Sequence, residues 1–493
     1  MNSKPYNFIF GSLFFVILIF NLSLLAEEKE SDFYEITSIP IPEGIVLEGS
    51  GLTWLDSNTI AVCGRRGQIY TIQNALGETS NLKFNLYADG LHEPVGLHAA
   101  GGWLYATQRG ELTRIKDMDG DGRADRFETV NDQWGITGDY HEYALGSSPD
   151  KDGNTWIVLC LTGSFSSQAE YRGWCVRITP DGELIPTSSG IRSPGGIGFN
   201  HLGDVFYSDN QGPWNGSSSL KHLMPGSFQG HPGGNVWYDL PDAKAAMGPR
   251  PTLPVSNSRI HIEREKIPEY IPPAIIFPHG VLGNSTSGFC FDAKGGFGPF
   301  KNQLFVLDQT YSVVNRVVLE KVNGVYQGVA FPFLKGFGSG NLAASMHDSG
   351  VMYVAGTDRG WGARGGKSFA LDRVRWTGEI PFEIYEMRVT SEGFRLVFTH
   401  PVDRQSATQL QSYQMSAYTY IYRSDYGSPV VDSSNPIIKS ASLSQDGMTV
   451  DLIVDGIVKG HIHELSCKGV RNKSGDELLH DTGYYTLNEI PEN

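Results

Sequence analysis

Twelve residues of this chain, DMDGDGRADRFE, combine oxygen-bearing side chains at a spacing that suits a hard metal ion. The candidate ligands are four aspartates, one glutamate and one main-chain carbonyl, supplied by Asp117, Asp119, Asp121, Asp125, Glu128 and Arg123. They occupy the positions from which a calcium loop offers its oxygens, and Gly122 stands where such a loop turns sharply. The sequence therefore predicts a calcium site, and the alternative is an acidic hairpin tip that binds no ion.

The segments around this loop belong to a module that recurs six times. Each copy joins an apolar strand to an apolar and aromatic strand through glycine-bearing turns, with apolar and polar residues alternating. The copies begin at Gly51, Val95, Tyr143, Gly195, Gly288 and Asn341. A period of about 45 to 50 residues is typical of four-stranded propeller blades, which bury their faces by stacking radially. We therefore predict an all-β fold, with a six-bladed β-propeller over residues 33–376. The acidic loop would then lie between two strands of a blade, and a bound calcium ion would hold that β-hairpin together.

Two segments depart from the repeat. Residues 228–280 separate the fourth and fifth copies and are rich in Pro and Gly. Such an insertion is expected over one mouth of the central channel. After Trp376 the pattern changes to short alternating strands, which predicts an immunoglobulin-like β-sandwich over residues 381–493.

The N-terminus has Lys4 and then an apolar run from Phe8 to Ala26, before the acidic EEKE. This order is typical of a signal peptide, so residues 1–26 are expected to direct the chain to the periplasm or the medium. An uncleaved N-terminal anchor is the alternative, because the run is nearly long enough to span a bilayer. We expect no other membrane contact.

Charge and cysteine content limit the partners and the cross-links. The formal net charge of -15 argues against a nucleic acid partner, because no basic stripe could release counterions from phosphates. Cys160 and Cys175 lie in neighbouring predicted strands and could form a disulfide, although buried free thiols are an equally simple interpretation.

Four phrases resemble the soluble glucose/sorbosone dehydrogenases, which are six-bladed propellers that use pyrroloquinoline quinone (PQQ). The phrases are GLHEPVGLHAAGGWLYATQRGELTRI, GDYHEYALGSSPDKDGNTWI, IRSPGGIGF and YSDNQGPWN. The chain is more similar still to propeller domains of large secreted proteins from planctomycete-type bacteria. The resemblance covers most of residues 50–376. It implies oxidation of an aldose or related carbohydrate alcohol by hydride transfer, with PQQ and calcium as cofactors and a separate electron acceptor.

The same match implies roles for individual residues. His141 would be the catalytic base beside Asp139, and Arg192 would lie against the quinone. The carbonyls of Gly212 and Pro213 would hold the calcium ion of the cofactor. These roles suit the chemistry, since a neutral histidine can accept a hydroxyl proton and cations can pair with the three carboxylates of PQQ.

The sequence also departs from the family in its cationic residues. Ser193 replaces an asparagine, and Ser339 to Asn341 stand where the family has two arginines. The family's fifth-blade lysine corresponds to Tyr311 or a neighbour. Arg359 follows in a glycine-rich loop, with Arg364 and Lys367, and is the candidate substitute.

Two functions therefore remain open. The first is a PQQ-dependent sugar dehydrogenase, and the alternative is a non-catalytic propeller that binds glycans or proteins, with the sandwich as a second binding module. A hydrolase or lyase is a weaker third option. Aromatic residues able to stack on sugar rings in either case are Trp214, Trp237, Tyr238 and Trp361, unless they pack between blades.

Overall fold

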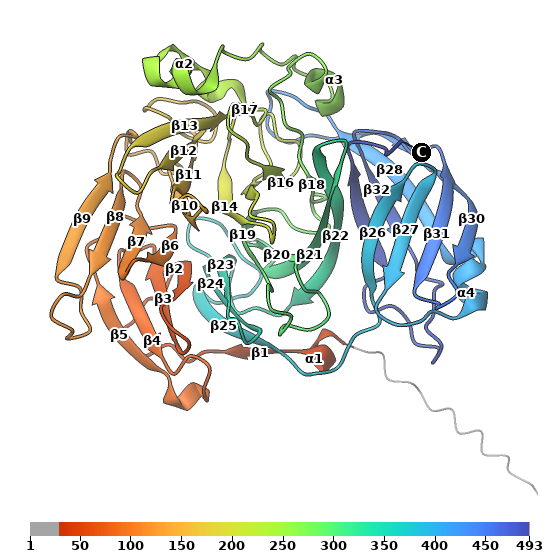
Figure 1. Ribbon diagram of the computed structural model, residues 1–493, viewed down its shortest axis with the longest axis horizontal. Helices are drawn as coiled ribbons and strands as arrows, with labels where there is room; N and C mark the ends of the chain where they lie inside the picture. Colours follow the sequence, from red (N-terminus) through yellow and green to blue (C-terminus); the bar gives the residue numbers. More distant parts are fainter. Residues whose placement is uncertain (1–28, 493) are drawn as a thin grey trace, which may run out of the picture.

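The computed structural model describes residues 29–492, whose strands form seven sheets (Figure 1). The first three sheets contain β2 (Gly49–Trp54), β3 (Thr59–Gly64), β4 (Ile69–Gln73) and β5 (Lys83–Ala88); β6 (Leu97–Ala100), β7 (Trp103–Thr107), β8 (Leu112–Lys116) and β9 (Arg126–Asn131); and β10 (Ala144–Pro149), β11 (Thr155–Leu159), β12 (Trp174–Ile178), β13 (Leu184–Ser189) and β17 (Ser227–Phe228). The next three contain β14 (Pro194–Phe199), β15 (Val205–Asp209), β16 (Ser219–His222) and β18 (Ile275–Ile276); β19 (Thr286–Phe291), β20 (Leu304–Asp308), β21 (Val313–Val322) and β22 (Val325–Lys335); and β23 (Asn341–Met346), β24 (Val351–Thr357), β25 (Phe369–Trp376) and β1 (Tyr34–Ser38).

These six sheets surround a central axis as blades. Their innermost strands contact one another in a closed circle that runs β2, β6, β10, β14, β19, β23 and back to β2. Close approach of these strands requires glycine: a Cβ on Gly196 would lie only 2.5 Å from the Cα of Gly288. β1 pairs with β25, so the N-terminal strand closes the last blade. The predicted all-β propeller is confirmed.

The remaining strands form a C-terminal β-sandwich. One sheet holds β26 (Ile384–Thr390), β27 (Gly393–Phe398), β31 (Thr449–Asp455) and β30 (Ile437–Leu443), and the other holds β33 (Thr482–Leu487), β32 (His461–Ser466), β28 (Gln414–Tyr420) and β29 (Val430–Ser434). β33 pairs with β22, so the second sheet continues the fifth blade and covers its edge (Figure 1). The sandwich is thus joined to the propeller by strand pairing. An immunoglobulin-like topology stays a prediction.

Short helices lie at the periphery. They are α1 (Glu30–Phe33), α2 (Pro241–Met247), α3 (Ile260–Arg264) and α4 (Arg404–Thr408), with the 3₁₀ helices η1 (Thr79–Asn81), η2 (Pro232–Asp239) and η3 (Leu410–Ser412). None of the helices in residues 29–492 has the length and apolarity needed to cross a membrane. The predicted signal peptide, residues 1–26, lies outside the described residues.

The sequence predicted that the insertion lies over one mouth of the channel, and this prediction is wrong. It begins with β17, which adds a parallel strand to the third blade, and ends after β18, which is the outermost strand of the fourth. α2 packs on β13, outside the ring (Figure 1). Burial of Ala243 and Met247 against the third blade explains this position, because apolar side chains find their core there.

All five cysteines are free in the structure, and Cys160 and Cys175 are buried. The disulfide between them that the sequence left open is therefore not formed. Free buried thiols were the other interpretation, and it holds. In the β11–β12 ladder, the residue opposite Cys175 is Val158.

The joint between α1 and the sandwich contains a buried histidine between two carboxylates. Nδ1 of His480 lies 2.6 Å from Oε1 of Glu383, and Nε2 lies 3.4 Å from Oε1 of Glu30. Burial alone would lower the pKa of His480, but the two glutamates outweigh it and raise the pKa to about 9. His480 is therefore a cation that ties the N-terminal segment to the sandwich.

We expect the free energy of unfolding to fall as the pH rises from about 6.5 to about 9. The unfolded chain releases the His480 proton near pH 6.5 and the folded chain near pH 9, so this stabilisation is complete below pH 6.5 and is lost progressively as the pH rises to about 9. The difference is on the order of 3 kcal/mol. Urea unfolding at about pH 6 and about pH 9.5 measures it. His480→Gln should flatten the slope and His201→Gln, at an exposed site, should keep it; an unchanged slope in His480→Gln would contradict the assignment.

Candidate functional site

A cavity of about 730 Å³ opens where the blades converge, and we call it the mouth pocket. All six blades line it, through the first residues of the innermost strands and the turns that follow the second strands. His141, Arg192 and Arg359, three of the residues predicted from the sequence, meet there. All residues of the insertion are described, and among them His279 alone lines the mouth pocket.

His141 lies in the loop between β9 and β10, where Asp139 orients it. Its main-chain N–H donates to Oδ1 of Asp139 at 2.9 Å, and its Nδ1 lies 3.5 Å from the same oxygen. Partial burial would raise the pKa of Asp139, but the N–H groups of His141 and Gly163 outweigh it and lower the pKa. Asp139 is therefore an anion that engages Nδ1 of the imidazole and leaves Nε2 to a ligand.

Two buried arginines fix the main chain of this loop. Nη2 of Arg109 donates to the carbonyls of Asp139 and Tyr140 at 2.7 and 2.6 Å. Arg172 is fully buried and donates to the carbonyls of Gly135 and Tyr143, both at 2.8 Å. Because these donors hold the backbone on both sides of His141, the imidazole is positioned before any ligand arrives.

Arg192 begins the fourth blade and carries a charge that no carboxylate in residues 29–492 pairs with directly. Its Nη1 donates to the carbonyls of Asn210 and Gln211, at 3.2 and 2.8 Å, and its Nε is buried without an acceptor. The guanidinium lies flat on Gly212, where a Cβ would come within 2.0 Å of Cζ. Burial lowers the pKa of Arg192, so its charge has a strong tendency to attract an anion.

Beneath Arg192 lies a buried ion pair. Oδ2 of Asp209 lies 3.2 Å from Nζ of Lys221, and both side chains are almost completely shielded from solvent. Asp209 also accepts the main-chain N–H groups of Arg192 and Ser193, at 3.3 and 2.8 Å. The pair therefore holds the segment just before β14, in which Arg192 lies.

Further arginines surround the mouth and outnumber the acids that pair with them. The group consists of Arg65, Arg66, Arg109, Arg359, Glu48 and Glu93, with N–O distances from 2.8 to 3.7 Å. Four cations share two carboxylates, which leaves two positive charges in excess. In a chain with a net charge of -15, this excess favours an anionic ligand at the mouth.

Four aromatic rings line the pocket although they remain about half exposed. They are Tyr140, Phe165, Trp361 and Tyr426, with exposed fractions from 44% to 57%. Of the four aromatic residues named from the sequence, Trp361 alone reaches the pocket. Trp214 packs on Tyr422, Trp237 donates to Ser167, and Tyr238 packs on Trp174.

Gly212, Pro213 and Tyr311 do not line the pocket. The carbonyl of Gly212 accepts the N–H of Asn215 at 3.1 Å within a tight turn. The hydroxyl of Tyr311 donates to the carbonyl of Gly280 at 3.0 Å, and Arg364 stacks on its ring, with Cζ 3.6 Å from the centroid. Neither the glycine–proline turn nor Tyr311 therefore presents itself to a ligand at the mouth.

The acidic loop forms the β8–β9 hairpin tip at the outer edge of the second blade. Carboxylate oxygens of Asp117, Asp119 and Asp125 all lie within 4.8 Å of one another. Gly122 has a φ of 91°, which fits the predicted sharp turn. The other two predicted carboxylates, Asp121 and Glu128, are not in this group, and Glu128 pairs with Arg114 and Arg126 at 2.5 Å each. Three of the five predicted carboxylate ligands thus converge.

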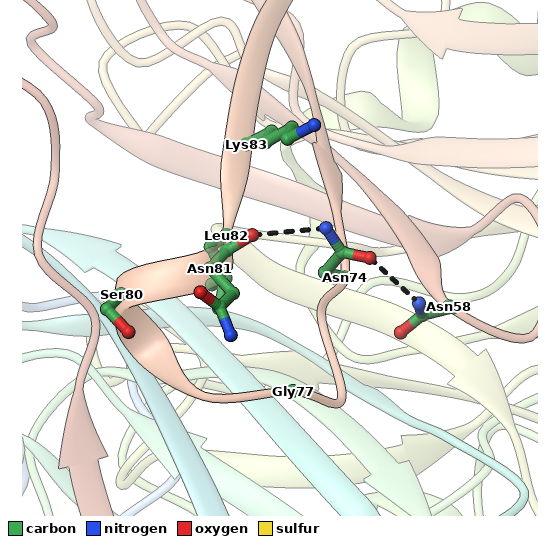
Figure 2. A pocket seen from close by; sticks show the side chains of 7 residues that line it. All are labelled: Asn58, Asn74, Gly77, Ser80, Asn81, Leu82 and Lys83. Carbon is green, nitrogen blue, oxygen red and sulfur yellow. Dashed lines mark hydrogen bonds between the residues drawn. The ribbon is translucent and has the colours of Figure 1, made fainter.

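A second hollow, of about 550 Å³, lies on the first blade (Figure 2). Its lining residues are Asn58, Asn74, Gly77, Ser80, Asn81, Leu82 and Lys83. The amide of Asn74 donates to the carbonyl of Asn81 at 3.1 Å and accepts from Asn58 at 3.4 Å. These amides hold one another, and the hollow contains no acid–base pair, so the mouth pocket is the candidate site.

Sequence reasoning missed Arg65, Arg109 and Tyr426. A repeated signal marks the arginines: the turn after the second strand reads Arg-Gly in three blades, at Arg66, Arg109 and Arg359. Equivalent positions in different blades meet at the axis, so this repeat predicts a cationic mouth. Tyr426 has no such signal, because it comes from the sandwich.

The family model for a domain of unknown function (DUF7133) matches residues 64–332. The chain belongs to this family. The DUF7133 match runs from the end of β3 into β22, so it includes His141 and Arg192 but neither Arg359 nor Tyr426. No curated protein matches the chain.

Several solved structures resemble this DUF7133 protein. One described as glucose dehydrogenase is 16% identical, with a TM-score of 0.51 over 69% of this chain and 98% of that one. Others are an oxidoreductase (glucose dehydrogenase) of Thermus thermophilus, 19% identical over 69% and 99% with a TM-score of 0.49, and the PQQ-bound aldose sugar dehydrogenase of Streptomyces coelicolor, 14% identical over 70% and 98% with a TM-score of 0.49. The first likeness shows that the chain has the fold of a glucose dehydrogenase, as the resemblance in sequence predicted.

Proposed function

We propose that this protein is an exported sugar dehydrogenase that oxidises an aldose or related carbohydrate alcohol by hydride transfer to PQQ. The observation that carries the proposal is the mouth pocket, whose lining includes an oriented histidine, His141, and the guanidinium of Arg192, which no carboxylate of the described residues pairs with. The two residues come from different blades, so the ring itself assembles the pair. Export follows from the predicted signal segment, residues 1–26, and an external electron acceptor would reoxidise the cofactor.

The pocket suits the carboxylates of PQQ. Arg65, Arg192 and Arg359 line it, and the arginines around the mouth exceed the glutamates that pair with them. Arg192 would hold one carboxylate, since its charge has no acidic partner among the described residues. Arg359 and Arg65 take over the cationic role that Ser339 to Asn341 and Tyr311 cannot fill. Bound PQQ would supply the hydride acceptor, which no side chain offers.

A calcium ion at Gly212 and Pro213 does not fit. Those residues lie outside the pocket, and Arg192 already donates to the carbonyls of Asn210 and Gln211 in the same turn. We therefore assign no step to calcium. An ion at Asp117, Asp119 and Asp125 would be a structural clamp of the β8–β9 hairpin, and this remains a prediction.

The residues of the chain would divide the work on the sugar. His141 would accept the proton of the reacting hydroxyl at Nε2, while Asp139 stabilises the imidazolium that forms. The half-exposed aromatic rings would orient the sugar ring and exclude water around it. Arg109 and Arg172 would keep the His141 loop in place during the reaction.

The decisive experiment adds PQQ to the purified mature protein and measures its affinity by calorimetry. Micromolar or tighter binding is expected, followed by reduction of an artificial electron acceptor with at least one aldose. Arg192→Met should weaken PQQ binding by about 10-fold to 100-fold, because it removes charge-assisted hydrogen bonds. Arg404→Met, at an exposed position in the sandwich, is the control and should bind as the wild type does. Absence of PQQ binding to the wild type would exclude the dehydrogenase.

A second candidate is a non-catalytic propeller that binds carbohydrate. The specific observation in its favour is the poor fit of calcium at Gly212 and Pro213, combined with aromatic rings that need no cofactor to bind a sugar. In that case PQQ would not bind, and the electron acceptor would stay oxidised. The same two measurements therefore separate the candidates.

A further inference from the structure

One residue of the mouth pocket comes from outside the propeller. Tyr426 belongs to the loop between β28 and β29, residues 421–429, in the C-terminal sandwich. Its ring centroid lies 5.5 Å from Cζ of Arg192 in the fourth blade. The residue is 51% exposed although it lines the pocket, so about half of its surface is free. The site is therefore built from both domains.

The loop that carries Tyr426 is fastened to the propeller on several sides. Tyr422 is 1% exposed, and it exchanges two main-chain hydrogen bonds of 3.1 Å with Ser258 of the insertion. The carbonyl of Arg423 accepts the N–H of Trp214 at 2.7 Å. The hydroxyl of Tyr422 also donates to the carbonyl of Gly230. Since the first residues of the loop, Tyr422 and Arg423, are anchored in this way, the place of Tyr426 shortly after them is restricted.

The propeller surface is shaped to receive this loop. Gly216, in the fourth blade, leaves no space for a side chain, because a Cβ there would lie 2.6 Å from Cβ of Tyr420. The hydroxyl of Tyr420 accepts the N–H of His279, another residue of the pocket rim, at 3.1 Å. Pairing of β22 with β33 also fixes the sandwich to the fifth blade. A module tethered for a separate purpose would not need this fit.

An aromatic ring held half exposed in a pocket that also offers polar groups has a specific use. A pyranose presents a face of C–H groups that packs on such a ring, while its hydroxyls need polar partners at the rim. Tyr140, Phe165 and Trp361 offer rings from the propeller, and Tyr426 adds one from a different domain. The polar groups of Asn210, Gln211 and Asn284 lie around the same cavity.

We propose that Tyr426 is a specificity-determining residue, by which the C-terminal sandwich supplies a stacking wall for a pyranose ring in the mouth pocket. The sandwich is then a component of the site and not a second binding module. The carbohydrate class of the ligand rests on the proposed function, while the two-domain construction of the pocket does not.

The test measures sugar binding to the full chain without PQQ, by calorimetry, with D-glucose, D-galactose, D-xylose and cellobiose as probes. At least one probe should bind, and Tyr426→Ala should weaken its binding about 10-fold. Tyr426→Phe keeps the ring and should bind within about twofold of the wild type. Ile437→Ala, which removes a side chain 57% exposed in the same sandwich, is the matched control and should change nothing. Thermal unfolding should be similar for all variants, because both residues are exposed.

Two outcomes would overturn the proposal: wild-type protein that binds none of the four sugars, or Tyr426→Ala that binds them as the wild type does. Reduction of the artificial acceptor reports on the proposed function separately. Sugar binding that depends on Tyr426, without any turnover, would leave this proposal standing and remove the dehydrogenase. Turnover with an unchanged KM in Tyr426→Ala would support the dehydrogenase and overturn this proposal.

Discussion

Replacing His141 by glutamine is expected to lower kcat by at least about 100-fold while PQQ affinity stays within about threefold. An anion already orients the imidazole in the pocket, since Oδ1 of Asp139 accepts the main-chain N–H of His141 and lies 3.5 Å from Nδ1 of the ring. Glutamine has a similar reach and can donate and accept hydrogen bonds, but it cannot take up a proton at neutral pH. The loss would therefore report proton transfer and not a change of shape.

Two companion variants make this result specific. Asp139→Asn should cost less, about 10-fold in kcat, because it weakens the orientation of the imidazole and leaves the base in place. His201→Gln, on the exposed turn between β14 and β15, should have no effect on kcat. If His141→Gln retained more than about a third of the wild-type kcat, His141 would not be the base, even with PQQ bound.

The ring could be predicted because its signal is local and repeated. Each blade carries its own glycine turns and alternating strands, and six similar modules have few ways to bury their faces other than radial stacking. The same argument extends to the loops at the mouth. His141 and Arg192 lie at the starts of the third and fourth blades, so a correct blade count already brings their positions to one axis.

Contacts between distant segments carry no such signal. The pairing of β22 with β33 joins Val329 to Tyr485, and nothing in either strand announces the partner. Tyr426 is placed in the pocket by that pairing and by the anchored loop, so it could not be found from the sandwich sequence alone. The position of the insertion was also decided at long range, because Met247 buries itself against the third blade.

The calcium site stays a prediction, and the acidic loop shows a different limit of the sequence. The spacing of acidic residues fixes which side chains are near one another, but not which of them already have partners. Glu128 has the sequence spacing of a calcium ligand. In the structure it lies in β9 opposite Arg114, and it pairs with that arginine and with Arg126. Cross-strand neighbours therefore compete with a metal ion for the last ligand.

The buried pair under the pocket leads to the second large effect. Asp209→Asn is expected to lower the free energy of unfolding by about 3 to 5 kcal/mol, because the ammonium of Lys221 would remain buried without its counter-charge. Burial would raise the pKa of Asp209, but Lys221 and the N–H groups of Ser193 and Arg192 outweigh it and lower the pKa. The native carboxylate is thus charged, and asparagine cannot replace that charge. Urea unfolding at pH 7 measures the loss.

A surface pair of the same chemistry separates burial from charge. Arg395 and Asp451 pair through two hydrogen bonds of 2.6 and 3.0 Å, but both side chains are about half exposed. Asp451→Asn should therefore cost less than about 1 kcal/mol. Removing both buried charges in Asp209→Asn/Lys221→Met should recover part of the stability, since the orphaned ammonium is gone. The double variant should not restore PQQ binding by Arg192, because it lacks the Asp209 carboxylate that accepts the main-chain N–H groups of Arg192 and Ser193. Equal losses in Asp209→Asn and Asp451→Asn would show that the pair beneath Arg192 is reached by water.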